Sequence, residues 1–163
     1  MQMNTSNLEL EYDTLFNICQ NNMENIEDIK CQYLQLLSFL TDTPNITTKE
    51  FLYQINEISK MGDIFICYVY NISSKSINIL GSGSIIYEPK IIHGCKKVGH
   101  IEDIVVHEIY RTHGIGKNII KKLIDIANEK KCYKVILDCK ADLKKFYEKF
   151  GFKQNNYQMA KYF

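Results

Sequence analysis

The residues best suited to do chemistry lie in one short stretch, Arg111-Thr112-His113-Gly114-Ile115-Gly116-Lys117. The stretch follows an apolar, strand-like run and opens a helical pattern, and a helix start leaves backbone N–H groups without partners. Those donors, with the positive end of the helix dipole, are suited to bind an anion such as a diphosphate. Gly114 and Gly116 would let phosphates approach the backbone closely, while Arg111 and Lys117 add positive charge.

Two widespread phosphate-binding patterns do not fit this stretch. The dinucleotide-binding fingerprint needs Gly-x-Gly-x-x-Gly in the first strand–helix unit and an acidic residue about 20 positions later. A Walker A loop needs Ser or Thr after its lysine, whereas Asn118 follows Lys117 here. For the loop taken alone, an ordinary strand-to-helix turn whose glycines serve only geometry is the simpler alternative.

Other polar residues stand near the ends of strand-like runs. Glu102 and Asp103 enter the run that leads to the glycine loop, Asp138 follows a later run, and Tyr147 lies in a short helical segment after it. Each also has a structural interpretation: the acids as solvated strand ends, Asp138 as a helix cap, and Tyr147 as a packing aromatic. No Cys/His spacing typical of zinc occurs, so no metal is expected.

Apolar periodicity predicts the elements that position these side chains. Apolar residues at helical spacing predict one helix over 15–40. A capping box at Thr47 and Glu50 predicts the start of a second helix, and an apolar face after Gly114 predicts a third. Strands are predicted over 64–70, 77–87, 97–106, 133–137 and 156–163, the fourth of them covered on both faces of the sheet. A short helix ends near Lys149, with Gly151 at its C-terminal end. The order α-α-β-β-β-α-β-α-β predicts an α/β fold, a three-layer α-β-α domain around a mixed central sheet.

Length and composition fit a single domain over residues 1–163, with residues 1–11 loose. The net charge of +1 gives no general field for binding nucleic acid, and 45% apolar residues suffice for a core. No signal peptide and no apolar run long enough to span a membrane occurs. With six cysteines and no Cys-x-x-Cys pair, we expect a cytoplasmic protein with reduced thiols.

The stretch Arg111–Gly116 resembles the Arg/Gln-x-x-Gly-x-Gly/Ala motif of the GNAT superfamily, whose members transfer acetyl from acetyl-CoA to amines, and the predicted element order fits that fold. Three segments are similar to the glucosamine-6-phosphate N-acetyltransferases: Gly99–Val106, Cys132–Cys139 and Phe146–Phe152. The resemblance covers about residues 33–159. It implies acetylation of the amine of glucosamine-6-phosphate, which gives N-acetylglucosamine-6-phosphate for UDP-N-acetylglucosamine biosynthesis.

The resemblance also implies residue roles. Tyr147, near the thioester sulfur, and Asp138, beside the cofactor, would be catalytic. The residues implied to bind acetyl-CoA are Ile104, Val105, Val106, Arg111, Thr112, His113, Gly114, Ile115, Gly116, Lys117 and Asp138. Those implied to frame the sugar phosphate are Thr41, Lys90, His93, Glu102, Asp103, Tyr133, Lys134 and, one residue out of the family's register, Lys161. A homodimer is implied as well, with the sugar phosphate near the subunit interface.

The chain departs from the family at Leu143 and Lys144, where an Asn and an apolar residue are usual. Leucine lacks the hydrogen-bonding amide of asparagine, so one cofactor contact is missing. Two alternatives stay open: a GNAT enzyme for another amine, such as a protein lysine, a polyamine or another amino sugar, and an inactive acetyl-CoA-binding scaffold. Lys90, His93 and Lys134 favour an anionic acceptor over a polycation.

Overall fold

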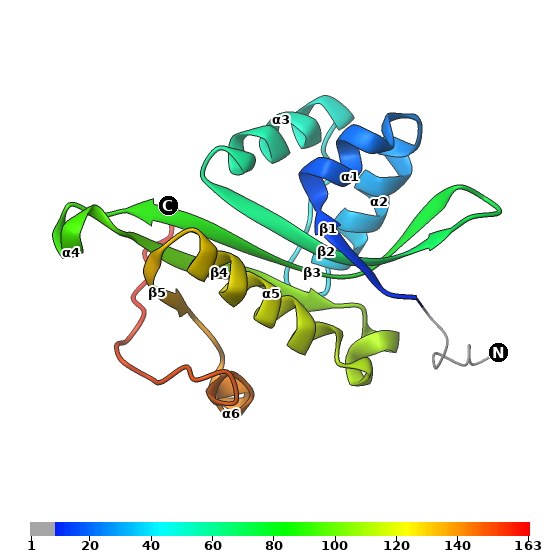
Figure 1. Cartoon of the computed structure of the whole chain (residues 1–163). Coiled ribbons are helices and arrows are strands. Elements are labelled where there is room, and N and C mark those ends of the chain that lie inside the picture. The colour runs from blue at the N-terminus through cyan, green and yellow to red at the C-terminus, as the bar shows by residue number, and fades with distance from the viewer. Residues whose placement is uncertain (1–8) are drawn as a thin grey trace.

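The computed structural model describes residues 9–163, which form a five-stranded sheet in the order β1-β2-β3-β4-β5 (Figure 1). The strands are β1 (Glu11–Thr14), β2 (Gly62–Asn71), β3 (Ser76–Pro89), β4 (Lys97–Val106) and β5 (Cys132–Leu137). Neighbouring strands are antiparallel except β4 and β5, which are parallel. The mixed sheet expected from the sequence is therefore confirmed.

Helices cover both faces of the sheet, so the three-layer α-β-α architecture is confirmed (Figure 1). One face carries α1 (Leu15–Asn21), α2 (Ile26–Leu37) and α3 (Thr48–Ser59), and the other carries α5 (Ile115–Glu129). The remaining helical segments are α4 (Ile92–Cys95), α6 (Lys144–Glu148) and the 3₁₀ turns η2 (Met23–Asn25), η3 (Glu108–His113) and η4 (Ala141–Leu143).

Two apolar cores hold the layers together. Leu15, Ile29 and Leu36 pack from the N-terminal helices onto Ile66 of β2, whereas α5 packs its own apolar stripe on the opposite face. That stripe contains Ile115, Ile119 and Leu123 at helical spacing, as predicted. The capping box is also present: Glu50 N donates to Thr47 Oγ1, and Thr47 N donates to Glu50.

Several sequence predictions about elements are wrong. The helix expected over 15–40 is interrupted by the turn η2, and the strand expected over 156–163 is absent because those residues are exposed and irregular. Residues 1–11 were expected to be loose, but Glu11 already pairs with Tyr68 in β1; residues 1–8 lie outside the described part. Strand β5 is only half-buried, since it is an edge strand with α5 on one face.

Candidate active site

Strands β4 and β5, at one side of the sheet, part midway along β4, and this split organises the site. Their pairing ends at Ile101 and Leu137, so residues 102–106 are paired only with β3. One backbone edge of β4 is therefore left without a neighbouring strand in the described chain. Ile104, Val105 and Val106 direct their side chains into the two cores, so they offer a ligand their backbone groups, as expected for the acetyl-CoA arm.

A β-bulge lies at the point of divergence. Ser82 pairs with Val105 and Ser84 with Glu102, so the single residue Gly83 faces both Asp103 and Ile104. Asp103 adopts a left-handed backbone conformation with φ of 52°. The side chains of Ile104 and Ile119 lie where a Cβ atom on Gly83 would go, so a larger residue opposite this bulge would require both of them to move. The bulge turns the backbone of β4 away from β5 and widens the split.

The glycine loop forms the start of α5 beside the end of β4. Gly114 has φ of 76°, and no side chain caps the helix. The first intrahelical bond runs from Asn118 N to Gly114 O at 3.0 Å, which leaves the preceding N–H groups as unpaired helix donors. A Cβ atom on Gly114 would meet no atom within 4 Å, so there is open space for an anion next to those donors.

Arg111, which was expected to add positive charge to this loop, makes structural contacts instead. Its Nε donates to the carbonyl oxygen of Val106 at 3.2 Å, and its guanidinium lies 5.8 Å from the centre of the Phe39 ring. It therefore ties the loop to the end of β4. The other loop residues, Thr112, His113 and Lys117, are exposed at the helix start.

Tyr147 of α6 and Asp138 after β5 lie on the other side of the split. The Tyr147 ring is 8% exposed, and burial, with a smaller effect of Cys139, raises the pKa of its hydroxyl. Tyr147 thus stays a protonated donor at neutral pH. Asp138 Oδ2 accepts a hydrogen bond of 2.8 Å from Gln158 Nε2. The aromatic ring of Phe146 lies 4.0 Å from the Cβ position of Gly116, which brings α6 next to the start of α5.

Three carboxylates gather at the bulge. Partial burial raises the pKa of Glu102, and the nearby charges of Asp103 and Asp138 raise it further, whereas His100 opposes them. Glu102 and Asp103 are adjacent on β4, and Asp138 directly follows β5. The expected substrate acids and the expected catalytic acid therefore share one negative patch, which suits a cationic or hydrogen-bond-donating amine.

Three basic residues expected to bind the phosphate and one tyrosine form a separate group at the far end of β4, which we call the hairpin-tip group: Lys90, His93, Lys134 and Tyr133. The His93 and Tyr133 rings are 4.3 Å apart, and Lys134 Nζ lies 5.6 Å from the centre of the Tyr133 ring. Lys90 forms an ion pair with Glu88. The Lys90 ammonium is the larger cause of the lowered pKa of Glu88, and His100 is the smaller one.

The expected substrate residues thus divide into two groups within one chain. Lys134 pairs with Val98, five residues from Asp103 along β4, which corresponds to about 17 Å. Thr41 follows α2 near Phe39, whose ring packs 5.1 Å from His107 at the other end of β4. Lys161 is exposed in the C-terminal segment, next to Phe163. The sequence did not reveal this separation.

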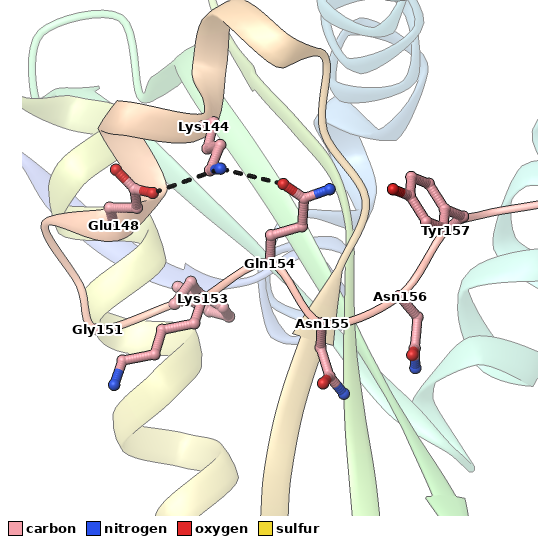
Figure 2. Close-up of a pocket in the computed structure, with 9 residues that line it drawn as sticks. Lys144, Glu148, Gly151, Lys153, Gln154, Asn155, Asn156 and Tyr157 are labelled. Carbon is pink, nitrogen blue, oxygen red and sulfur yellow. Dashed lines mark hydrogen bonds and ion pairs between the residues drawn. The ribbon is translucent and has the colours of Figure 1, made fainter.

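A cavity of about 700 Å³ opens between α6 and the C-terminal segment (Figure 2). Lys144 lies at its wall, where it donates to Gln154 Oε1 at 3.0 Å and faces Glu148 at 4.0 Å. None of the residues expected to bind acetyl-CoA or the sugar lines it. The cavity is bordered by residues 153–157, so its shape depends on where that irregular segment runs.

Two supporting contacts near the site were not predicted from the sequence. Asn118 Nδ2 donates to the Tyr12 hydroxyl at 3.1 Å, which fastens the first turn of α5 to β1. The buried hydroxyls of Tyr33 and Ser82 lie under the bulge. Nothing in the spacing of these residues distinguishes them from ordinary surface or core positions.

Within residues 9–163, no helix is long and apolar enough to cross a membrane, and no cluster of His, Cys, Asp and Glu could hold a metal ion.

Comparisons with known proteins agree with this geometry. The model of the acetyltransferase (GNAT) family matches residues 32–152. The glucosamine 6-phosphate N-acetyltransferase of Arabidopsis thaliana is 39% identical over 138 residues, which cover 85% of this chain and 92% of that protein. The crystal structure of the Arabidopsis thaliana enzyme superimposes with a TM-score of 0.79 at 34% identity, covering 94% and 98% of the two chains. An acetyltransferase from Clostridium acetobutylicum, solved with acetyl-CoA, shares the fold at 18% identity and a TM-score of 0.64, with 94% and 96% covered.

The split sheet, the glycine loop at the start of α5 and the family match together define the class: the chain belongs to the GNAT acetyltransferase family. Within that family, its relatives include the glucosamine 6-phosphate N-acetyltransferases of plants, Dictyostelium discoideum and Candida albicans, at 33–39% identity.

Proposed function

We propose that this chain transfers the acetyl group of acetyl-CoA to the amine of glucosamine-6-phosphate. The observation that carries the proposal is the β4–β5 split, with helix donors of α5 on one side and the Glu102–Asp103–Asp138 carboxylates at its mouth. Its likeness to glucosamine 6-phosphate N-acetyltransferases over most of the chain supports the choice of amine. The product would enter UDP-N-acetylglucosamine biosynthesis, and a cytoplasmic location stays a prediction from the sequence.

The residues of the chain fit acetyl-CoA as a co-substrate. The N–H groups at the start of α5 and the open space at Gly114 suit its phosphates, with Lys117 adding charge. The unpaired edge of residues 104–106 suits the amide-rich pantetheine arm, and a strand N–H there would polarise the thioester carbonyl. Arg111 would act indirectly, by fixing the loop on β4.

The transfer would be direct, within a ternary complex. The neutral amine attacks the thioester carbonyl carbon, the new C–N bond forms, and the C–S bond breaks. The nitrogen loses one proton, for which the Asp138 carboxylate, its backbone carbonyl or a water is an acceptor. The coenzyme A thiolate leaves and takes one proton from the Tyr147 hydroxyl, which solvent then restores. Cys139 is exposed and does not serve as an acyl carrier in this scheme.

The acceptor assignment predicts a strong preference for the phosphorylated sugar. We expect a kcat/KM for glucosamine-6-phosphate at least about 100-fold above that for glucosamine, since two or three charged hydrogen bonds to the phosphate are lost together. Thiol release from acetyl-CoA measures both rates, with spermidine and a lysine peptide as further acceptors. Equal kcat/KM for both sugars would refute the assignment, and a preference for spermidine or the peptide would point to the other amines.

A homodimer is part of the proposal, since one chain does not bring the phosphate and acid groups together. The backbone of Lys134 in the hairpin-tip group lies about 17 Å from Asp103 along β4, farther than one hexose phosphate reaches. Beyond α6, Tyr157, Met159 and Tyr162 are each at least nine-tenths exposed, and β5 has no partner on its outer edge among the described strands. An apolar segment beside an open strand edge suits pairing with a second copy of the chain.

Light scattering of the full chain should therefore give twice the mass of one chain at assay concentration. Met159→Asp should shift this mass toward the monomer, because a charge would enter the apolar interface. Met61→Asp is the matched control, since Met61 is also exposed but lies in the turn between α3 and β2. A monomeric wild-type chain that is fully active would contradict the proposed dimer.

A further inference from the structure

Two hydroxyl groups are buried beneath the β4 bulge, on the face of the sheet that α2 covers. The Ser82 side chain is 0% exposed, and its Oγ has no hydrogen-bond partner among the described residues. The Tyr33 side chain of α2 is 7% exposed and lies against Ser82. Ser82 is paired with Val105, directly before the bulge, so both hydroxyls lie under the backbone that carries Asp103.

The helix that carries Tyr33 is fixed on the sheet. The neighbouring Gln32 donates from Nε2 to the carbonyl of Ile77 at 2.8 Å, and its Oε1 accepts from Ile79 N at 2.9 Å. The Tyr33 ring packs against Phe51, with ring centres 6.1 Å apart. These contacts account for the ring of Tyr33 and for its position, but not for a hydroxyl at this place, because phenylalanine would pack in the same way.

The Ser82 hydroxyl differs from that of the nearby Ser84, because it has no hydrogen-bond partner among the described residues. Ser84, the other serine that flanks Gly83, donates to the carbonyl of Glu102 at 3.1 Å. A buried hydroxyl without a partner destabilises a fold by about 1–3 kcal/mol. Alanine would fit at Ser82 without that loss of stability, so packing alone does not explain the serine.

The Asp103 carboxylate of the active site acts electrostatically on this hydroxyl pair. Burial is the main reason that the pKa of Tyr33 rises to about 12, and the Asp103 carboxylate raises it further, while Ser82 acts in the opposite direction. Tyr33 is thus a protonated donor within the field of Asp103. The other charged groups at this position are Glu102 and Asp138, which repel Asp103, with His100 further along β4.

We propose that Tyr33 and Ser82 are positioning residues that hold the Asp103 carboxylate in place for the acceptor amine. Ser82 would donate to the Tyr33 oxygen, and Tyr33 would donate to Asp103 directly or through one bound water. A carboxylate held in this way keeps its orientation next to two like charges and on a left-handed backbone. The inference rests on the proposed function, since Asp103 is assigned to the amino-sugar side of the site.

Ser82→Ala separates this role from a structural one. Since the Ser82 hydroxyl would bond only to Tyr33 in this arrangement, its removal should lower the melting temperature by no more than about 2–4 °C. The KM for glucosamine-6-phosphate should nevertheless rise about five- to tenfold, the equivalent of one hydrogen bond, with unchanged affinity for acetyl-CoA by calorimetry. Normal acceptor kinetics in a folded Ser82→Ala variant would overturn the inference.

Tyr33→Phe provides the second measurement, with a larger expected rise of the acceptor KM, about tenfold to 100-fold, because a hydrogen bond to a charged group is lost. Tyr87→Phe is the matched control: the Tyr87 hydroxyl donates to Asp63 at 2.8 Å, far from the bulge, and its loss should leave the KM unchanged. Parallel losses of acceptor and acetyl-CoA affinity in Tyr33→Phe would mean a structural role and would overturn the inference. A wild-type protein inactive with glucosamine-6-phosphate would refute the proposed function instead, a separate outcome.

Discussion

Gly114→Val should lower the affinity for acetyl-CoA by about 100-fold while the protein stays folded. A valine side chain would project into the open space beside the first N–H groups of α5, where no atom lies within 4 Å of its Cβ position. Phosphates held there would lose one or two charged hydrogen bonds, each worth about 1.5–3 kcal/mol. Isothermal calorimetry with acetyl-CoA measures the change.

Two control variants separate phosphate exclusion from backbone strain. Valine at φ of 76° is strained by about 1–2 kcal/mol, a loss that most domains tolerate. Gly94→Val creates the same strain, at φ of 69° with open space around it, but lies at the hairpin tip. Gly116→Ala would place its Cβ 3.5 Å from Val106 Cγ2, an ordinary contact. Gly94→Val should keep acetyl-CoA affinity. Gly116→Ala, which the Gly/Ala position of the motif allows, should lower that affinity far less than Gly114→Val does. Unchanged affinity in folded Gly114→Val would refute the phosphate site.

Local signals in the sequence predicted the elements that carry the cofactor site. The capping box at Thr47, the apolar stripe of α5 and the glycine loop each depend on residues within one or two turns of one another. Strand β4 was predicted with its observed bounds. These features are encoded locally, so neighbouring residues suffice to recognise them.

The errors concern features that tertiary pairing decides. Strand β1 is short and contains Glu11 and Asp13, so it lacks an alternating apolar pattern and is defined only by pairing with β2. Residues 156–163 are rich in apolar and aromatic side chains, as in a strand, yet they pair with no strand of the described part of the chain. The separation of the hairpin-tip group from Asp103 depends on the register between β4 and β5, which residue types alone do not specify.

At the bulge, too, the roles of single residues could not be predicted from the sequence. Gly83 leaves room for the Ile104 side chain, which lies where its Cβ would go, and Ser82 matters because its buried hydroxyl has no hydrogen-bond partner among the described residues. Neither property can be deduced from a Gly-Ser-Gly-Ser stretch in a β-rich run. The chemistry at the mouth of the split thus depends on packing between α2, β3 and β4 that only the fold defines.

Tyr147→Phe should reduce kcat by about 100-fold. The changes in KM and in acetyl-CoA affinity should be much smaller. The ring would keep its contacts with Phe146 and Phe152, so only the hydroxyl is lost. Burial raises the pKa of that hydroxyl, which therefore remains protonated through neutral pH and available as a donor.

The variant should affect kcat and not KM because the hydroxyl acts late in the reaction. Negative charge develops on the coenzyme A sulfur only as the C–S bond breaks, so a donor to that sulfur stabilises the transition state and not the bound substrates. Removing one such donor lowers rates by about 10²–10³-fold in other enzymes. Steady-state kinetics and a thermal melt should be measured on the same variant, beside Tyr68→Phe, whose hydroxyl contacts Glu11 away from the site. If Tyr147 is only a packing aromatic, Tyr147→Phe will turn over like Tyr68→Phe, and an unchanged kcat would remove its hydroxyl from the mechanism.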